Sequence, residues 1–340
     1  MFELLKGTAL LLLVLAGFTG FSLKAPRGMK AMGALASAAT ASFLVEAFQR
    51  YVGGDLFGIE FLGRVGDSAG GMGGVAAAIL VPLALGVSPT YAVMMGAVMA
   101  KMGILPGFIA GYVMSFIIPK LEEKIPDGLD LIVIICLAAP LARGVAELVS
   151  PGVTFALSTI GDIIIAAQQA SPFVMAFILG GVITVVATAP ISSMALTAML
   201  GLTGLPMAIG ALSVMSSSFM NFVFFDRMKF GDRDTTIAVA IEPLTQADVI
   251  SANPIPVYAT NFIGGGIAGM IVNYFGLINN ATGTATPIAG FAVMFGFNPA
   301  KEVLITAGLC MVAGITVGYI GSIVFKNYKI KTVKEIRGMA

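Results

Sequence analysis

Two long stretches of the chain contain no charged side chain, one from Ile163 to Phe225 and the other from Val249 to Ala300. A helix rises about 1.5 Å per residue, so the first stretch is long enough to cross a hydrocarbon layer of roughly 30 Å two or three times. Apolar side chains occur on all sides of these helices, whereas a surface helix of a soluble protein has a polar face. The pattern predicts an all-α protein that spans a bilayer repeatedly.

Several apolar stretches have the length of membrane spans. They are Gly7–Leu23, Ala31–Phe48, Met72–Ala100, Met102–Pro119, Leu131–Val149, Ser171–Ala189, Leu205–Phe225, Ile255–Phe275 and Val303–Phe325. We interpret the first as an uncleaved span rather than a secretory signal, because many hydrophobic segments follow it. The expected fold is a polytopic helical inner-membrane protein with about nine or ten transmembrane helices.

Two further apolar segments, Ile237–Pro254 and Leu277–Pro299, are too broken for a simple crossing. Basic residues in the tail after Phe325 and in the loop Lys24–Lys30 place both on the cytoplasmic side, by the positive-inside tendency. We expect the loop Asp226–Asp234 on the same side, so an even number of crossings must separate it from the tail. Either each broken segment is a re-entrant hairpin that returns to its own side, or the two together add a pair of crossings.

The composition agrees with a membrane protein and narrows its chemistry. Only 11% of the residues are charged, which is too few for the solvated surface of a soluble protein. The net charge is +1, so the chain offers no basic face that could bind nucleic acid. The absence of histidine removes the commonest proton shuttle and any phosphohistidine. Cys136 and Cys310 lie in apolar runs without a second ligand at metal spacing, so we expect buried thiols, no metal and no cofactor.

The first candidate site is Glu242-Pro243, within the polar interruption Ile241–Asp248, with Asn253 shortly after it. Proline has no N–H and leaves a carbonyl one turn earlier without its helical partner. An acid at membrane depth is costly, and is by default a functional candidate that can bind sugar hydroxyls, a proton or a cation. The alternative is that Glu242 and Asp248 lie at a solvated loop edge.

The second candidate is the polar segment Asn279–Pro287, which contains Thr282, Thr284 and Thr286. Thr and Asn side chains bond to nearby backbone, and Gly and Pro interrupt helices, so this segment is expected to be unwound. Its hydroxyls, amides and free backbone groups suit a polyol or an ion. The alternative is an ordinary loop at the membrane surface.

Other polar residues occur inside the predicted spans. Asn221 is a further binding candidate, near the run Ser216–Ser218, although helical serines commonly bond to their own backbone. Arg143 and Glu147 are four residues apart on one helix face, which favours a structural ion pair.

Pairs of glycines at i, i+4 spacing predict close contacts between helices. These pairs are Gly107 with Gly111, Gly265 with Gly269, and Gly314 with Gly318. The glycine cluster Ser68–Gly74 favours helix packing over a ligand site for the same reason.

Four segments point to a known family: Gly103–Gly111 (GILPGFIAG), Ile125–Asp130 (IPDGLD), Ala240–Asp248 (AIEPLTQAD) and Thr284–Phe291 (TATPIAGF). Through them most of the chain resembles the membrane-embedded IIC component of the sugar phosphotransferase system, in particular the PfoR-like IIC family. In related IIC proteins a Gly-Ile-Thr-Glu-type motif supplies a carboxylate to the sugar. The resemblance implies that Glu242 is this acid, although an alanine replaces the glycine and the threonine is missing.

The resemblance implies a single IIC-like transport domain over residues 1–325 and a basic cytoplasmic tail over residues 326–340. It implies that the protein binds and translocates a sugar or polyol. The expected solute-binding residues are Glu242, Pro243, Asn253, Thr282, Thr284, Thr286 and Asn221. Two alternatives remain: an ion-coupled secondary transporter, in which Glu242 binds a cation or proton, and a membrane solute sensor that signals through its tail.

The sequence contains no histidine that could accept a phosphoryl group, and we expect no fused IIA or IIB domain. Any phosphoryl group must therefore come from a separate cytoplasmic IIB protein, and we expect no catalytic residue in this chain. The expected setting is the plasma (inner) membrane, with many crossings, a cytoplasmic C-terminus, surrounding lipid and a homodimeric assembly.

Overall fold

A computed structural model describes residues 5–6, 9, 13, 16–17, 20–22, 24–126, 128–188 and 193–337. All regular elements in those residues are helical, which confirms the predicted all-α fold. The chain divides into two compact units. Unit 1 comprises Met1–Ala16, Gly161–Thr197 and Gly201–Ala340, and unit 2 comprises Gly17–Ile160 and Ala198–Leu200. The single transport domain expected over residues 1–325 stays a prediction.

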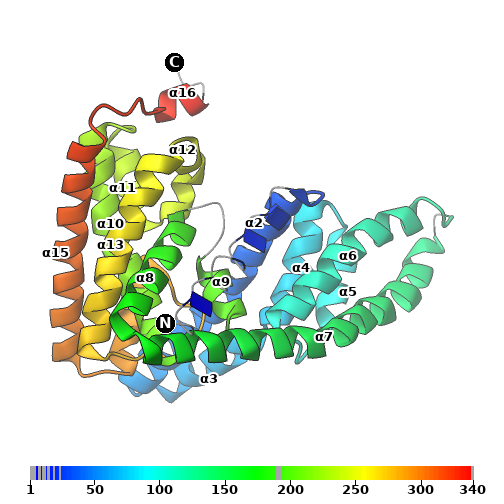
Figure 1. Ribbon diagram of the computed structural model, residues 1–340. Coiled ribbons are helices and arrows are strands. Elements are labelled where there is room, and N and C mark those ends of the chain that lie inside the picture. Colours follow the sequence, from blue (N-terminus) through cyan, green and yellow to red (C-terminus); the bar gives the residue numbers. More distant parts are fainter. Residues whose placement is uncertain are drawn as a thin grey trace. The chain divides into compact units, whose positions relative to one another are not determined.

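Unit 2 contains the helices from α2 to most of α7 (Figure 1). Their bounds are α2 Gly28–Ala39, the π-helical segments η1 Thr40–Leu44 and η2 Ala47–Leu56, α3 Glu60–Gly70, α4 Gly73–Leu85, α5 Pro89–Ala97, α6 Ile104–Glu122 and α7 Asp130–Ala170. The single span predicted over Met72–Ala100 is wrong, because Gly86 adopts a left-handed conformation (φ 96°) that ends α4, and Pro89 starts α5.

Helix α7 packs one face against the core of unit 2. Ile134, Ala138, Ala142 and Ala146 are fully buried and follow one another at intervals of four residues. Cys136 is two residues from Ile134, which places it on the opposite side of the helix, and it is exposed. The prediction of a buried thiol is therefore wrong for Cys136, whereas it is confirmed for Cys310.

The predicted ion pair on α7 is present in unit 2. Arg143 Nε lies 2.7 Å from Glu147 Oε1. Arg143 Nη1 also donates to the carbonyls of Val98 and Ala100, each at 3.0 Å. Carbonyls at the end of a helix lack intrahelical partners, so the arginine has a structural role at the end of α5.

Unit 1 is a helical bundle with α10 at its centre; α8, α13, α14 and α15 pack against it (Figure 1). The element bounds are α8 Pro172–Thr188, α9 Ser193–Met199, α10 Gly204–Met228, α11 Arg233–Ile241, the 3-10 segment η3 Pro243–Gln246, α12 Ala247–Ala252, α13 Pro254–Phe275, α14 Pro287–Val293, η4 Met294–Gly296, α15 Ala300–Val324 and α16 Val333–Arg337. Most of α10 is buried, including the whole run from Pro206 to Ser218.

The predicted glycine contacts between helices are confirmed. A Cβ on Gly265 or Gly269 of α13 would collide with Thr184 and Ala176 of α8, and a Cβ on Gly314 or Gly318 of α15 with the α10 backbone. In unit 2, a Cβ on Gly107 of α6 would collide with the backbone of Gly74 on α4. Small residues thus allow these backbones to approach closely, as in other membrane helix pairs.

Six helices in the described part of the chain are long and apolar enough to cross a membrane, or seven if α3 and α4, bent by 56°, form one broken span. The six are Gly28–Leu56, Ile104–Glu122, Ile132–Ala156, Gly204–Met228, Pro254–Phe275 and Ala300–Val324. The number is below the predicted nine or ten, because Gly7–Leu23 lies mostly outside the described residues and α8 has only 17 residues. The multi-pass architecture itself is confirmed.

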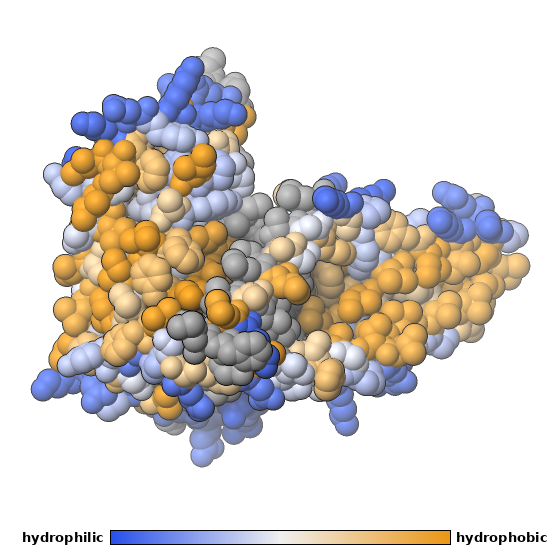
Figure 2. Space-filling model, in the orientation of Figure 1, coloured by the Kyte–Doolittle hydropathy of each residue, from blue (hydrophilic) through white to orange (hydrophobic). Residues whose placement is uncertain are grey.

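The visible surface of unit 1 has a broad hydrophobic band between hydrophilic residues at its two ends (Figure 2). Large apolar side chains on α13 and α15 contribute to its exposed surface, among them Ile263, Leu309, Val312 and Val324. Apolar side chains exposed along whole helices are expected where hydrocarbon rather than water surrounds the protein.

Candidate functional site

The first broken segment, predicted over Ile237–Pro254, corresponds to residues 233–253 in unit 1. It starts and ends beside the C-terminal tail. At its start, the carbonyl of Phe230 accepts a hydrogen bond of 2.8 Å from Val333 N–H. At its end, Asn253 Nδ2 donates to the carbonyl of Lys331 (2.9 Å) and Asn253 Oδ1 accepts from its N–H (2.8 Å). The segment is therefore a hairpin, which we name the first hairpin. The loop before it and the tail lie at the same end of unit 1, as predicted.

The second broken segment, predicted over Leu277–Pro299, corresponds to residues 278–298. It starts and ends beside the first turn of α10. The N–H of Asn279 donates to the carbonyl of Gly204 at 3.0 Å. The side chain of Asn298 accepts from the N–H of Ile278 (2.9 Å) and donates to its carbonyl (2.7 Å), so the two ends are joined. This second hairpin enters at the opposite end of α10 from the first, because the tail lies beyond the last turn of that helix.

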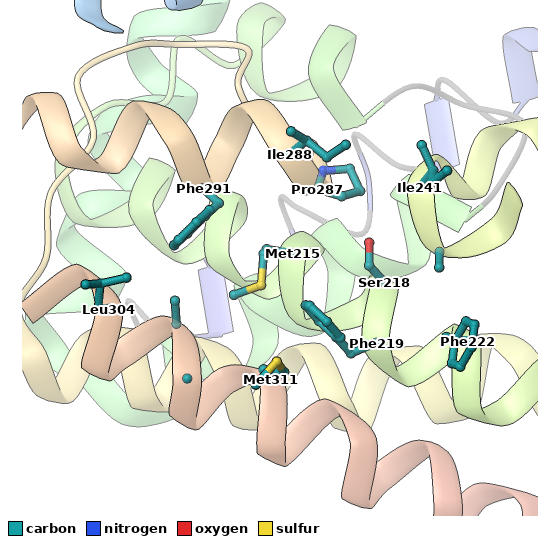
Figure 3. A pocket seen from close by; sticks show the side chains of 13 residues that line it. Met215, Ser218, Phe219, Phe222, Ile241, Pro287, Ile288, Phe291, Leu304 and Met311 are labelled. Carbon is teal, nitrogen blue, oxygen red and sulfur yellow. The ribbon is translucent and has the colours of Figure 1, made fainter. Parts of the chain in front are cut away.

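The two hairpins meet at a cavity of about 670 Å³ in unit 1 (Figure 3). The cavity is open to the surface, because the lining residues Ile241, Ile288 and Leu304 are exposed. Its lining residues are Met215, Ser218, Phe219 and Phe222 of α10, Ala240 and Ile241 of α11, Pro287, Ile288 and Phe291 of α14, and Leu304, Ala307, Gly308 and Met311 of α15. The first hairpin contributes the residue directly before Glu242, and the second contributes the residue directly after Thr286. Both interrupted segments therefore lie beside the same cavity.

The cavity wall is apolar and aromatic. Among the described residues that line it, none is charged, and Ser218 has the one polar side chain. Rings from Phe219, Phe222 and Phe291 form part of the wall (Figure 3). The volume lies in the range of small-molecule sites, which typically combine an apolar wall with a few polar groups that fix orientation.

Glu242 marks the tip of the first hairpin. It leaves the helical conformation (φ −149°, ψ 99°), and its carbonyl accepts hydrogen bonds from the N–H (3.0 Å) and the hydroxyl (2.8 Å) of Thr245. Pro243 follows as the first residue of η3 and is buried, while Glu242 itself is half-buried. The break predicted at Glu242-Pro243 is confirmed; binding by either residue stays a prediction.

The threonine segment is unwound, as predicted, because residues 277–286 form no helix. The Thr284 hydroxyl donates to the Ala281 carbonyl (2.7 Å) and accepts from Asn279 Nδ2 (2.9 Å). The Thr282 hydroxyl donates to a carbonyl of α9 at 3.2 Å. Thr286, directly before α14, is 6% exposed. Two of the three hydroxyls therefore hold the loop together, and Thr286 is the one nearest the cavity wall in sequence.

Neither of the two asparagine candidates is among the residues that line the cavity. Asn221 and Asn261 exchange amide hydrogen bonds of 2.8 and 3.2 Å and are fully buried between α10 and α13. Asn253 holds the tail. Both amides thus have structural partners, and a binding role for either stays a prediction.

The tail packs against the first hairpin through an apolar cluster. Val333 is buried together with Phe224, Phe225, Phe230, Val239, Val249, Ile250 and Val257. Helix α16 starts with a capping box, in which the N–H of Thr332 donates to Glu335 Oε2 at 2.7 Å. This hydrogen bond lowers the pKa of Glu335 below its ordinary value of 4.5. The same cause, the N–H of Thr235, lowers the pKa of Asp232 at the start of α11.

Sequence reasoning missed most of the cavity wall. Met215, Ser218, Phe219 and Phe222 follow the i, i+3, i+4, i+7 spacing of one helix face, which is a detectable signal. This helix is apolar on all sides, however, so the sequence alone does not distinguish the face that lines the cavity from the other faces. Which face borders a space depends on α11, α14 and α15.

One comparison with known proteins gives a match. A family model described as "Phosphotransferase system, EIIC" matches residues 29–337, which include both hairpins and the whole cavity wall. No curated protein and no solved structure matches the chain.

Proposed function

This chain belongs to the EIIC family of the phosphotransferase system, and on that basis we propose that it binds a sugar or polyol in the cavity of unit 1 and translocates it across the plasma membrane. The protein is a multi-pass membrane component of that system. Membership of the family implies sugar transport as its general role. The solute site and the coupling to phosphorylation belong to the proposal.

The observation that supports the proposal is the convergence of the two hairpins on one cavity. Irregular backbone at membrane depth is tolerated where protein buries it or where it lines a watery space. Paired interrupted segments also mark the solute sites of many transporters. Here Ala240 and Ile241 come from one hairpin, Pro287 and Ile288 from the other, and both pairs line the same wall.

Glu242 is the acid that we assign to this site. It directly follows the lining residue Ile241 and stands at a break where helical bonding stops. A carboxylate accepts hydrogen bonds from solute hydroxyls, and such charge-assisted bonds are stronger than neutral ones. The protein then binds and positions the solute, while a separate cytoplasmic IIB protein supplies the phosphoryl group and no covalent step occurs on this chain.

The test is uptake of radiolabelled hexoses and hexitols into sealed vesicles, with and without a phosphoryl donor system. Glu242→Gln is compared with Glu302→Gln, an exposed acid in the first turn of α15 that does not line the cavity. Loss of a charged hydrogen bond predicts at least about tenfold slower uptake for Glu242→Gln, with Glu302→Gln close to wild type.

Other results would reject parts of the proposal. Equal uptake in both variants removes Glu242 from the mechanism. Uptake that needs an ion gradient and no phosphoryl donor would favour the ion-coupled transporter. Ligand-dependent signalling without uptake would favour the solute sensor.

We further propose that the shared end of the tail and the loop 226–234 faces the cytoplasm, and that two copies form a homodimer. Exposed basic residues at this end, Lys229, Lys326, Lys329 and Lys334, support the orientation by the positive-inside tendency. A cysteine placed at Lys334 should react with an impermeant maleimide in inverted vesicles and not in intact cells. Chemical cross-linking in the membrane tests the dimer, and a monomer alone would reject it.

A further inference from the structure

One of the four serines in the central part of α10 differs from the others. Ser213 donates to the carbonyl of Gly265 (3.0 Å), Ser216 to that of Cys310 (2.6 Å) and Ser217 to that of Val214 (2.8 Å). The hydroxyl of Ser218 has no hydrogen-bond partner among the described residues. Helical serines usually donate to a carbonyl one turn earlier, and a buried hydroxyl without a partner costs free energy.

Ser218 is also the serine that lines the cavity. Its side chain is 7% exposed, and its hydroxyl oxygen points toward the side of the cavity formed by Pro287 (Figure 3). Phe219 and Phe222 lie beside it on the same helix. The unpartnered hydroxyl therefore belongs to a residue in the wall of the space for a ligand.

The chemistry of the wall limits what this solute can be. The described lining residues carry no charge, and the carboxylate that we assign beside them, Glu242, would repel an anion, so the wall favours a neutral molecule over a sugar phosphate. Aromatic rings suit the C–H face of a sugar or polyol because both surfaces are apolar. A serine hydroxyl can donate and accept, so it matches a solute hydroxyl in either direction.

We propose that Ser218 recognises one hydroxyl of a neutral sugar or polyol in this cavity and sets specificity for that hydroxyl. The inference rests on the proposed function and names a residue that the sequence resemblance does not. A site that hydrogen-bonds a substrate hydroxyl rejects the analogue that lacks it, because the protein group is then left unpaired. Ser218 should thus distinguish a sugar from one of its monodeoxy analogues.

Binding can be measured directly because the chain contains no tryptophan. Phe222→Trp places a single fluorophore in the cavity wall, and purified full-length protein is titrated with D-glucose, D-galactose and D-mannitol and with their monodeoxy analogues. Ser218→Ala and Ser217→Ala are compared in this background. Ser217 is the matched control, since it is buried on the same helix and already has an acceptor.

The expected result is opposite for the two serines. Ser218→Ala should weaken binding of the preferred probe about five- to tenfold, the value of one hydrogen bond, and should abolish discrimination against one monodeoxy analogue. Without solute, its melting temperature should equal or exceed that of the parent, because an unpaired hydroxyl is removed. Ser217→Ala should lower the melting temperature and leave affinity within about twofold.

Two results would overturn the inference and leave translocation standing. One is saturable binding with equal affinity in the parent and Ser218→Ala. The other is no fluorescence change with a probe that wild-type vesicles take up, which would place the site outside this cavity. If wild-type vesicles take up none of a wider set of hexoses and hexitols, with or without a phosphoryl donor, the proposed function itself fails.

Discussion

The two hairpins of unit 1 reach the same cavity but are held in different ways. The second hairpin is closed by its own residues: Asn279 bonds to Thr284 and Ala281, and Asn298 bonds to both backbone groups of Ile278. The first hairpin is held largely by a distant part of the chain. Asn253 binds Lys331, 78 residues away, and Val333 completes the apolar cluster beside it.

The difference suggests that the two hairpins respond differently to changes elsewhere in unit 1. Bonds between residues five or twenty apart close the second hairpin at little entropic cost. Its further bonds to α9 and to the start of α10 then fix it within the bundle. We therefore expect the position of the first hairpin to depend on tail docking more than that of the second. Since Glu242 lies at the tip of the first hairpin, we expect tail docking to influence the acid and to leave the threonine segment unaffected.

The largest expected effect comes from removing the central amide of the second hairpin. Asn279→Ala leaves the buried N–H of Ala281 without a partner and removes the buried amide that donates to the Thr284 hydroxyl. The expected cost is about 3 kcal/mol, seen as a lower melting temperature of the detergent-solubilised protein. Asn280→Ala is the matched control, because Asn280 is exposed and makes one bond of 3.2 Å to Gly204. Equal melting temperatures in the two variants would contradict the prediction.

A smaller effect is expected from releasing the tail. Asn253→Ala removes both side-chain bonds to Lys331, and about 1.5 kcal/mol of lost docking would raise the open population roughly tenfold. Trypsin cleavage after Lys329, Lys331 and Lys334, followed by mass spectrometry, measures that population. Asn327→Ala, an exposed residue of the same tail, should cleave like wild type. If Asn253→Ala is equally resistant, the tail is held by the apolar cluster alone.

The smallest effect is a dependence of docking on acid pH. The pKa of Glu335 is below 4.5 in the folded tail, because the N–H of Thr332 donates to its carboxylate. Its stabilisation is therefore complete above pH 4.5 and is lost as the pH falls through the lower folded value. In a Tyr328→Trp variant, emission should shift to the red only below about pH 4.5.

Glu335→Gln is the control for this titration, because it cannot lose a proton and should reduce the amplitude of the shift. The pKa of Asp232 is lowered by its bond from Thr235, and Lys334 adds a smaller effect of the same sign. A remaining transition at still lower pH is assigned to this second carboxylate. A transition centred above pH 5 would show that another group controls docking.

Several features followed from the sequence because they depend on neighbouring residues. Gly265 and Gly269 predicted a helix contact, since any larger side chain there would hold the backbones apart. Pro243 predicted the break at Glu242, since a proline cannot donate to the preceding turn. The polar composition of residues 279–287 predicted an unwound loop for a similar local reason.

Other features could not be predicted because they depend on residues far apart in the chain. The partner of Asn221, for example, is Asn261 of α13, 40 residues away. The partner of Asn253 is Lys331 in the tail, 78 residues away. The split of Met72–Ala100 depends on the left-handed conformation of Gly86, which a glycine permits and does not require.

The sequence by itself determined that this protein is a helical membrane protein, where its helices are interrupted and which glycines form helix contacts, because these properties arise from hydropathy and local backbone chemistry. The tertiary structure decided which interruptions meet at one cavity and which polar groups are already used. A serine hydroxyl has the same chemistry at positions 213, 216, 217 and 218. In the folded protein the one at Ser218 has no partner among the described residues, and it lies beside a space of about 670 Å³.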